Sequence, residues 1–129
     1  MGACYSVNVK VQLVDEADAI KALNEHIVND IRTNYSLDKY AACGVTTETF
    51  DDLMRILLAD VQGDVSIDKK GKFTIYDNGF NASYGWERVM MEWFEVLAPF
   101  LADGSQMLIY PDEDYDKLVI KNGECIQVH

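Results

Sequence analysis

The first residues of the chain alternate apolar and polar side chains with a period of two. The apolar positions are Tyr5, Val7, Val9, Val11 and Leu13, and polar residues separate them as far as Gln12. This alternation is typical of a β-strand that buries one face. A strand is therefore predicted over residues 5–13.

The pattern then changes to the period of an α-helix. The apolar stripe, drawn at 100° per residue, consists of Ile20, Leu23, Ile27 and Ile31. Asp15 can cap the first turn, where acidic residues are favourable. We expect one helix from about Asp15 to Thr33.

The middle of the chain predicts a second helix and two short strands. Residues 34–45 are less periodic and are interpreted as a loop with a short helical turn. Thr46 and Thr47 are the expected caps of a helix that buries Phe50, Leu53, Met54, Leu57 and Val61 and ends near Gln62-Gly63. Strands follow over 64–69 and 72–77, and the turn residues Asn78-Gly79 and the stretch 81–85 are expected to break the chain.

The last third predicts a helix and a β-meander. A broad apolar arc runs from Trp86 to about Leu101, and Pro99 is expected to distort its last turn. Strands are predicted over 106–110, 116–121 and 124–128, with Asn122-Gly123 as a hairpin turn.

These elements predict an α+β fold. Their order is β-α-α-β-β-α-β-β-β, which favours a mostly antiparallel sheet of about five to six strands with two to three helices on one face. No linker or repeat interrupts the 129 residues, so a single domain is expected over 1–129.

Composition favours a cytoplasmic protein. Apolar residues make up 49% of the chain, which is typical of globular domains, and no apolar run approaches the ~20 residues of a membrane span. The first fifteen residues lack a signal-peptide pattern. Three cysteines, far apart in sequence, argue against a disulfide framework.

The net charge of −11 is the unusual property of this sequence. It disfavours binding to nucleic acid and to anionic membranes and favours basic partners. From Trp86 to Asp116 there are eight acidic residues and one basic residue, Arg88. The leading hypothesis is therefore a non-enzymatic inhibitor or adaptor, in the manner of nucleic-acid mimics, anti-defence proteins or immunity proteins, that docks a basic protein surface. The predicted partner-binding residues are Glu87, Glu92, Glu95, Asp112, Glu113, Asp114 and Asp116.

Metal, cofactor and catalytic motifs are not supported. Asp112, Asp114 and Asp116 match the start of a calcium loop, but Lys117 and Gly123 stand where glycine and glutamate are required. No phosphate-binding glycine motif is present. The sequence therefore predicts no metal site, no cofactor and no catalytic residue.

The alternative hypothesis is a small-molecule-binding domain or an enzyme with a pocket. One location is near Cys43, whose thiol precedes the second predicted helix. The other is the aromatic segment around the start of the third helix. Its possible pocket residues are Tyr76, Phe80, Tyr84 and Trp86. The sequence does not indicate an oligomeric state.

Overall fold

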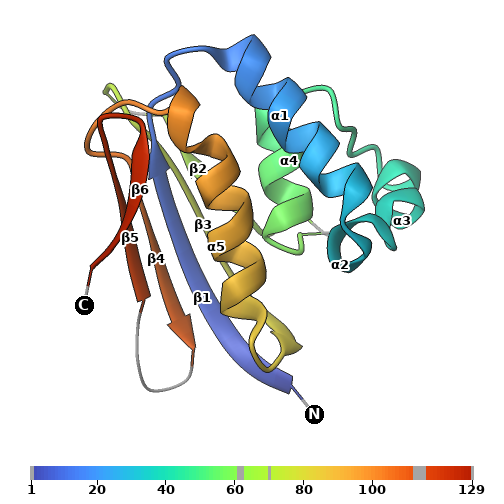
Figure 1. Ribbon diagram of the computed structural model, residues 1–129. Helices are drawn as coiled ribbons and strands as arrows, with labels where there is room; N and C mark the ends of the chain where they lie inside the picture. The colour runs from blue at the N-terminus through green and yellow to red at the C-terminus, as the bar shows by residue number, and fades with distance from the viewer. Residues whose placement is uncertain (1, 61–62, 70, 112–115, 129) are drawn as a thin grey trace.

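The protein consists of one antiparallel sheet with helices on a single face. The computed structural model describes residues 2–60, 63–69, 71–111 and 116–128 (Figure 1). Within them, six strands pair in the order β2-β3-β1-β4-β5-β6, and every neighbouring pair is antiparallel. The predicted α+β class and antiparallel sheet are confirmed.

The element bounds follow the chain from the N-terminus. The strands are β1 (Gly2–Val11), β2 (Ser66–Asp68), β3 (Thr74–Ser83), β4 (Gln106–Pro111), β5 (Asp116–Lys121) and β6 (Glu124–Val128). The helices are α1 (Glu16–Asn29), α2 (Ile31–Asn34), α3 (Leu37–Ala42), α4 (Phe50–Leu57), α5 (Trp86–Leu97) and the 3-10 turn η1 (Ala98–Phe100). The described helices outnumber the predicted two to three, because the first predicted helix is divided into α1 and α2 and because α3 occupies the segment expected to be mostly loop.

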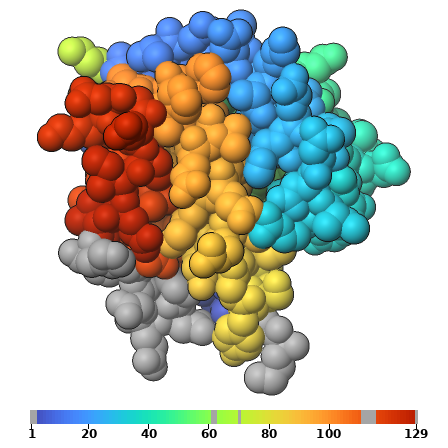
Figure 2. All heavy atoms as spheres, in the orientation of Figure 1, coloured from blue at the N-terminus to red at the C-terminus, as the bar shows by residue number. Residues whose placement is uncertain are grey.

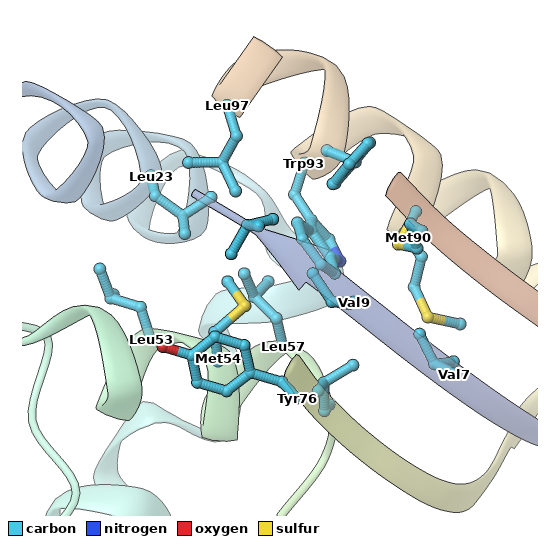
Figure 3. Packing of buried hydrophobic residues seen from close by; sticks show 14 of the residues in the cluster. Val7, Val9, Leu23, Leu53, Met54, Leu57, Tyr76, Met90, Trp93 and Leu97 are labelled. Atoms are coloured by element: carbon cyan, nitrogen blue, oxygen red, sulfur yellow. The ribbon is translucent and has the colours of Figure 1, made fainter. Parts of the chain in front are cut away.

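The core lies between the sheet and the helical layer. The predicted alternation of β1 is confirmed, since Val7 and Val9 are fully buried and point toward the helices. Trp93 and Leu97 of α5 and Leu23 of α1 meet them from above (Figure 3). Burying large apolar side chains contributes roughly 1.5–3 kcal/mol for each, so this layer is the main source of stability.

The first predicted helix is broken at Asp30. Its backbone is extended there, with φ −112° and ψ 115°, and its side chain accepts a hydrogen bond from the Arg32 backbone N–H at 2.9 Å. A carboxylate that bonds a nearby backbone N–H competes with helix continuation. The prediction of one helix to Thr33 is wrong, and Ile31, placed on its buried stripe, is 78% exposed.

The second predicted helix starts later and ends earlier than expected. Thr49, and not Thr46 or Thr47, is its N-cap and accepts from the Asp52 N–H at 3.2 Å. The helix ends at Leu57 instead of near Gln62-Gly63. Ala59 then takes a left-handed conformation with φ 56°, which turns the chain away from the helix axis.

Strand β3 continues through the predicted break at Asn78-Gly79. The Asn78 side chain is buried and donates to the Leu58 carbonyl at 2.7 Å, so its polar group is satisfied inside the fold. Residues 78–83 remain paired with β1 as far as Ser83↔Gly2. The expectation of a chain break at 78–79 is therefore wrong, and the turn comes at Gly85, where φ is 86°.

The C-terminal third agrees with the sequence pattern. Pro99 lies in η1, so the last turn of the predicted helix is a 3-10 turn. Asn122 and Gly123 both have positive φ, 54° and 74°, as a tight hairpin between β5 and β6 requires. In the part of the chain that the structure describes, no helix has the length and apolar character to cross a bilayer.

Candidate functional site

A cavity of about 280 Å³ lies between the start of α5 and the end of β3. Its remaining walls come from α2, α3 and the end of α4. The lining residues are Arg32, Thr33, Tyr35, Ser36, Tyr40, Ile56, Leu57, Ala59, Phe80, Asn81, Ala82, Ser83, Trp86, Val89 and Trp93. Ligand sites in proteins are concave, mostly apolar and about 300 Å³ or larger, so this cavity is at the small end of that range.

The cavity borders a part of β3 that β2 does not cover. Strand β2 pairs with β3 at residues 75–77, whereas β3 continues to Ser83. Among the described strands, residues 79–83 of β3 therefore have a neighbour on the β1 side alone. The side chains of Phe80 and Ala82 face the helices from this uncovered stretch and form one wall of the cavity.

The hydroxyl of Tyr5 holds the start of α5 against this wall. It donates to the Ser83 carbonyl at 3.0 Å and to Glu87 Oε2 at 2.9 Å, and the Trp86 backbone N–H donates to it at 3.2 Å. Gly85 precedes the helix and has no side chain to cap it, so Tyr5 takes that role. Burial and the Glu87 carboxylate raise the pKa of Tyr5, which keeps the hydroxyl protonated.

Arg32 of α2 forms an ion cluster beside the cavity. Its Nε donates to Asp30 Oδ1 at 2.9 Å, its Nη2 donates to Asp30 Oδ2 at 2.6 Å, and the same nitrogen bonds Glu92 of α5. The hydrogen bond to Arg32 lowers the pKa of Asp30 to about 2. Asp30 and Arg32 therefore stay charged at neutral pH, and the cluster joins α2 to α5 at the cavity wall.

Two of the lining residues, Trp93 and Tyr40, are buried and carry polar groups. Trp93 is fully buried, and its Nε1–H has no hydrogen-bond acceptor among the described residues. Tyr40 is 4% exposed, and burial, with smaller contributions from Tyr35 and Asp60, raises its pKa to about 12. Its hydroxyl therefore remains protonated over the physiological range.

The lining of the cavity is mostly apolar and aromatic, and its described polar groups are hydroxyls, an amide and the Arg32 guanidinium. Aromatic walls with a few hydrogen-bond donors are typical of sites that hold a small molecule.

The structure separates the four aromatic residues predicted to line a pocket. Phe80 and Trp86 line the cavity. Tyr76 is buried in the core between β3 and α4, and its hydroxyl donates to Asp51 at 2.6 Å. Tyr84 is 63% exposed, and Cys43 is an exposed free thiol outside the described lining of the cavity.

The predicted acidic site is divided among several environments. Glu87 accepts from Tyr5, and Glu92 binds Arg32, so both carboxylates take part in internal contacts. Glu95 is exposed, and Asp116 accepts from Gln127 at 3.3 Å. Asp112, Glu113 and Asp114 lie outside the described residues. Among those that are described, no three His, Cys, Asp or Glu side chains gather closely enough to hold a metal ion.

Sequence reasoning missed Arg32, Tyr40 and Trp93 as cavity residues. Trp93 was placed on a buried helical stripe, which is correct, but a stripe does not show that the indole N–H lacks a partner. Arg32 contacts Glu92, sixty positions away in sequence. No local signal in the sequence identifies such a contact.

Comparisons with known proteins give no relative from which a role could be transferred. Neither the protein-family models, nor the curated proteins, nor the solved structures contain a match to this chain. Its function must therefore be argued from the site itself.

Proposed function

We propose that this protein is a binding domain for a small, largely apolar molecule, held in the cavity between α5, the end of β3 and α2–α3. The observation that carries the proposal is the composition of the wall. Five aromatic side chains from three separate segments line one cavity of about 280 Å³: Tyr35, Tyr40, Phe80, Trp86 and Trp93. Aromatic rings provide large apolar contact with little conformational freedom to lose on binding.

The contacts around the cavity support a preformed site. Tyr5 fixes the Trp86 backbone, and the Arg32 cluster fixes α2 relative to α5. A site held in its binding conformation binds more tightly, because less ordering entropy is lost on association. These contacts come from elements that the core already positions, so the cavity does not depend on a ligand to form.

The proposal is tested by filling the cavity. Ala82 lines it and faces the helices, so Ala82→Leu puts a branched side chain into the space. Binding of aromatic compounds of about ten non-hydrogen atoms is followed by thermal shift and by ¹H–¹⁵N NMR. We expect the wild type to bind some of these compounds, with changes in the NMR signals of the residues around the cavity. Ala82→Leu should weaken this binding at least about tenfold.

The matched control is Ala17→Leu, at an exposed position of α1 away from the cavity. It adds the same side chain to the protein and should leave binding unchanged. The proposal is refuted if no compound of this class binds the wild type. It is also refuted if the NMR spectra show that Ala82→Leu is folded and this variant binds the compounds as tightly as Ala17→Leu does.

A second proposal keeps the predicted docking of a basic protein but moves it to the helical face. The exposed carboxylates that support it lie on α1 and α5, whose surfaces adjoin in Figure 2. They are Glu16, Asp18, Glu25 and Glu95. Exposed charge of one sign increases association rates with a basic partner and makes them salt-dependent.

A ten-residue lysine peptide tests this second proposal. Reversing both Glu25 and Glu95 to lysine should weaken its binding more than reversing Glu95 together with Asp64, an exposed residue of the loop before β2. Both double variants change the net charge equally. Equal weakening by the two would show that total charge, and not the helical face, attracts the peptide.

A further inference from the structure

We infer that residues 79–83, the edge of β3 beside the cavity, bind an extended peptide segment of a partner protein. The segment adds a strand to the sheet and places one apolar side chain in the cavity. It is uncharged at its centre and basic at its ends. This inference rests on the proposed function, since that side chain occupies the same volume as the proposed small apolar molecule.

The backbone of this edge is paired on one side. In the described part of the chain, the hydrogen bonds of residues 79–83 all go to β1, including those of Ser83 with Tyr5 and of Asn81 with Cys4. The N–H and C=O groups of successive strand residues alternate in direction, so about half of those in this stretch are directed away from β1. Another β-strand satisfies such a row of donors and acceptors.

The edge also lacks the features that usually prevent strand addition. Exposed edges are commonly protected by charged side chains or by proline. The sequence of residues 79–83 is Gly-Phe-Asn-Ala-Ser, which contains neither. Strand β2 pairs with β3 at residues 75–77, so this neutral stretch is left outside that pairing. Its composition therefore permits pairing with a further strand.

The cavity lies directly against this edge. Residues 80–83 of the edge are themselves part of its lining. On the helix-facing side of β3, Tyr76 and Asn78 are buried, whereas Phe80 and Ala82 are half-buried, so the core opens at this end of the strand. Side chains of an added strand alternate between the two faces of the sheet, and one that faces the helices enters the cavity. Peptides recognised by strand addition combine such main-chain pairing with a pocket for a side chain.

Charge determines which peptide fits. Arg32 is the one ionised residue among the described lining, and Asp30 and Glu92 both bind its guanidinium. A charged side chain in the cavity would therefore lose hydration without meeting an uncompensated partner, so the central residue is apolar. Outside the cavity, the net charge of −11 attracts basic residues at the ends of the peptide. A second copy of this chain is a poorer occupant of the edge, because two molecules of this charge repel each other.

Peptide selection on the folded chain tests the inference. The probes are random peptides of about seven residues with a lysine at each end, displayed on phage, which are long enough to span the edge. We expect enrichment of peptides with an aromatic or aliphatic residue at one central position. Dissociation constants of synthetic copies are measured by fluorescence anisotropy. Ala82→Leu should weaken their binding at least about tenfold, and the control Ala17→Leu should leave it unchanged.

Backbone methylation of the tightest peptide separates strand addition from binding through side chains alone. Methylation of alternate amides gives two versions of the peptide with the same number of methyl groups. In one version the methyl groups face the edge of β3, and in the other they face solvent. We expect the first version to bind at least about tenfold more weakly than the unmodified peptide, because it loses several hydrogen bonds, and the second to bind within about twofold of it.

Hydrogen exchange of the wild type provides an independent readout, in case Ala82→Leu folds poorly. Alternate backbone amides within residues 79–83 should exchange at least about tenfold more slowly when the peptide is bound. Unchanged exchange at these amides, equal effects of the two methylation patterns, or no enriched peptide would overturn the inference. Protection of the same amides by self-association in the absence of peptide would also overturn it. The proposed function survives these outcomes if aromatic compounds bind the cavity, and both are refuted if neither peptides nor compounds bind.

Discussion

The pairing of Asp30 with Arg32 should contribute a measurable and pH-dependent part of the stability. The pKa of Asp30 is lowered from 3.8 to about 2, chiefly by the side-chain hydrogen bond to Arg32. At 1.36 kcal/mol per pKa unit, this difference corresponds to at most roughly 2 kcal/mol of stability at neutral pH. The Arg32 side chain is 38% exposed, however, so solvent screens the pair, and a coupling energy of about 1 kcal/mol is expected.

A double-mutant cycle measures this coupling. Asp30→Asn keeps a side chain that can cap the Arg32 N–H, and Arg32→Gln removes the positive charge. Free energies of unfolding of the wild type, both single variants and the double variant come from urea titrations at pH 7, followed by tryptophan fluorescence. The folded-state pKa of Asp30 is depressed, so its contribution is fully present above the unfolded value of 3.8 and is lost as the pH falls toward 2. About half should be lost by pH 3.

The control is an exposed pair of opposite charges within one helix. Lys21 and Glu25 stand four residues apart on α1, and both are exposed. Their cycle should give less than about 0.5 kcal/mol, as exposed i,i+4 pairs do. The reasoning fails if the Asp30–Arg32 coupling is no larger than this control, or if it is the same at pH 7 and pH 3.

Two further predictions concern groups outside the cavity. Asp60 is 2% exposed and accepts hydrogen bonds from three backbone N–H groups of the following loop at 2.6 to 2.8 Å, so Asp60→Asn should lower the free energy of unfolding by about 3 kcal/mol. The control Asp64→Asn, at an exposed position of the same loop, should change the free energy of unfolding by less than about 0.5 kcal/mol. Similar urea midpoints for the two variants would contradict this prediction. Burial, with a smaller effect of Glu95, raises the pKa of Cys125 to about 11. At pH 8 this half-buried thiol should therefore react with iodoacetamide about 100-fold more slowly than the exposed Cys43, as followed by mass spectrometry. Comparable rates for the two cysteines would show that Cys125 is not held in this environment.

The parts of the fold that the sequence predicts are those in which one periodicity runs without interruption. Alternation in β1 and the broad apolar arc of α5 both match the burial in the structure. Asn122-Gly123 is equally clear, because few sequences adopt two successive positive φ angles. In these segments, local preference and tertiary packing favour the same conformation.

Sequence reasoning fails where a single polar side chain decides the backbone. Asp30 interrupts a helical stripe by bonding the N–H of Arg32, and the stripe itself gives no sign of this. Asn78 is a turn residue by preference, yet its amide is satisfied by the Leu58 carbonyl and the strand continues. Both outcomes depend on a hydrogen bond, and in the second case the partner lies twenty residues away.

These two failures are also the two features that build the cavity. Because the chain turns at Asp30, Arg32 reaches Glu92 of α5, and α2 and α3 come to lie across from the end of β3. Because β3 continues past Asn78, its residues Phe80 and Ala82 extend beyond the part of β3 that pairs with β2, and they form the opposite wall of the cavity. A single helix to Thr33 and a strand ending at Asp77 would satisfy the local pattern equally well, but would leave the cavity without two of its walls. Departures from local preference are expected where a protein maintains a functional site. The coincidence of both departures at one aromatic-lined cavity is therefore the strongest structural argument for testing the proposed binding of a small molecule there.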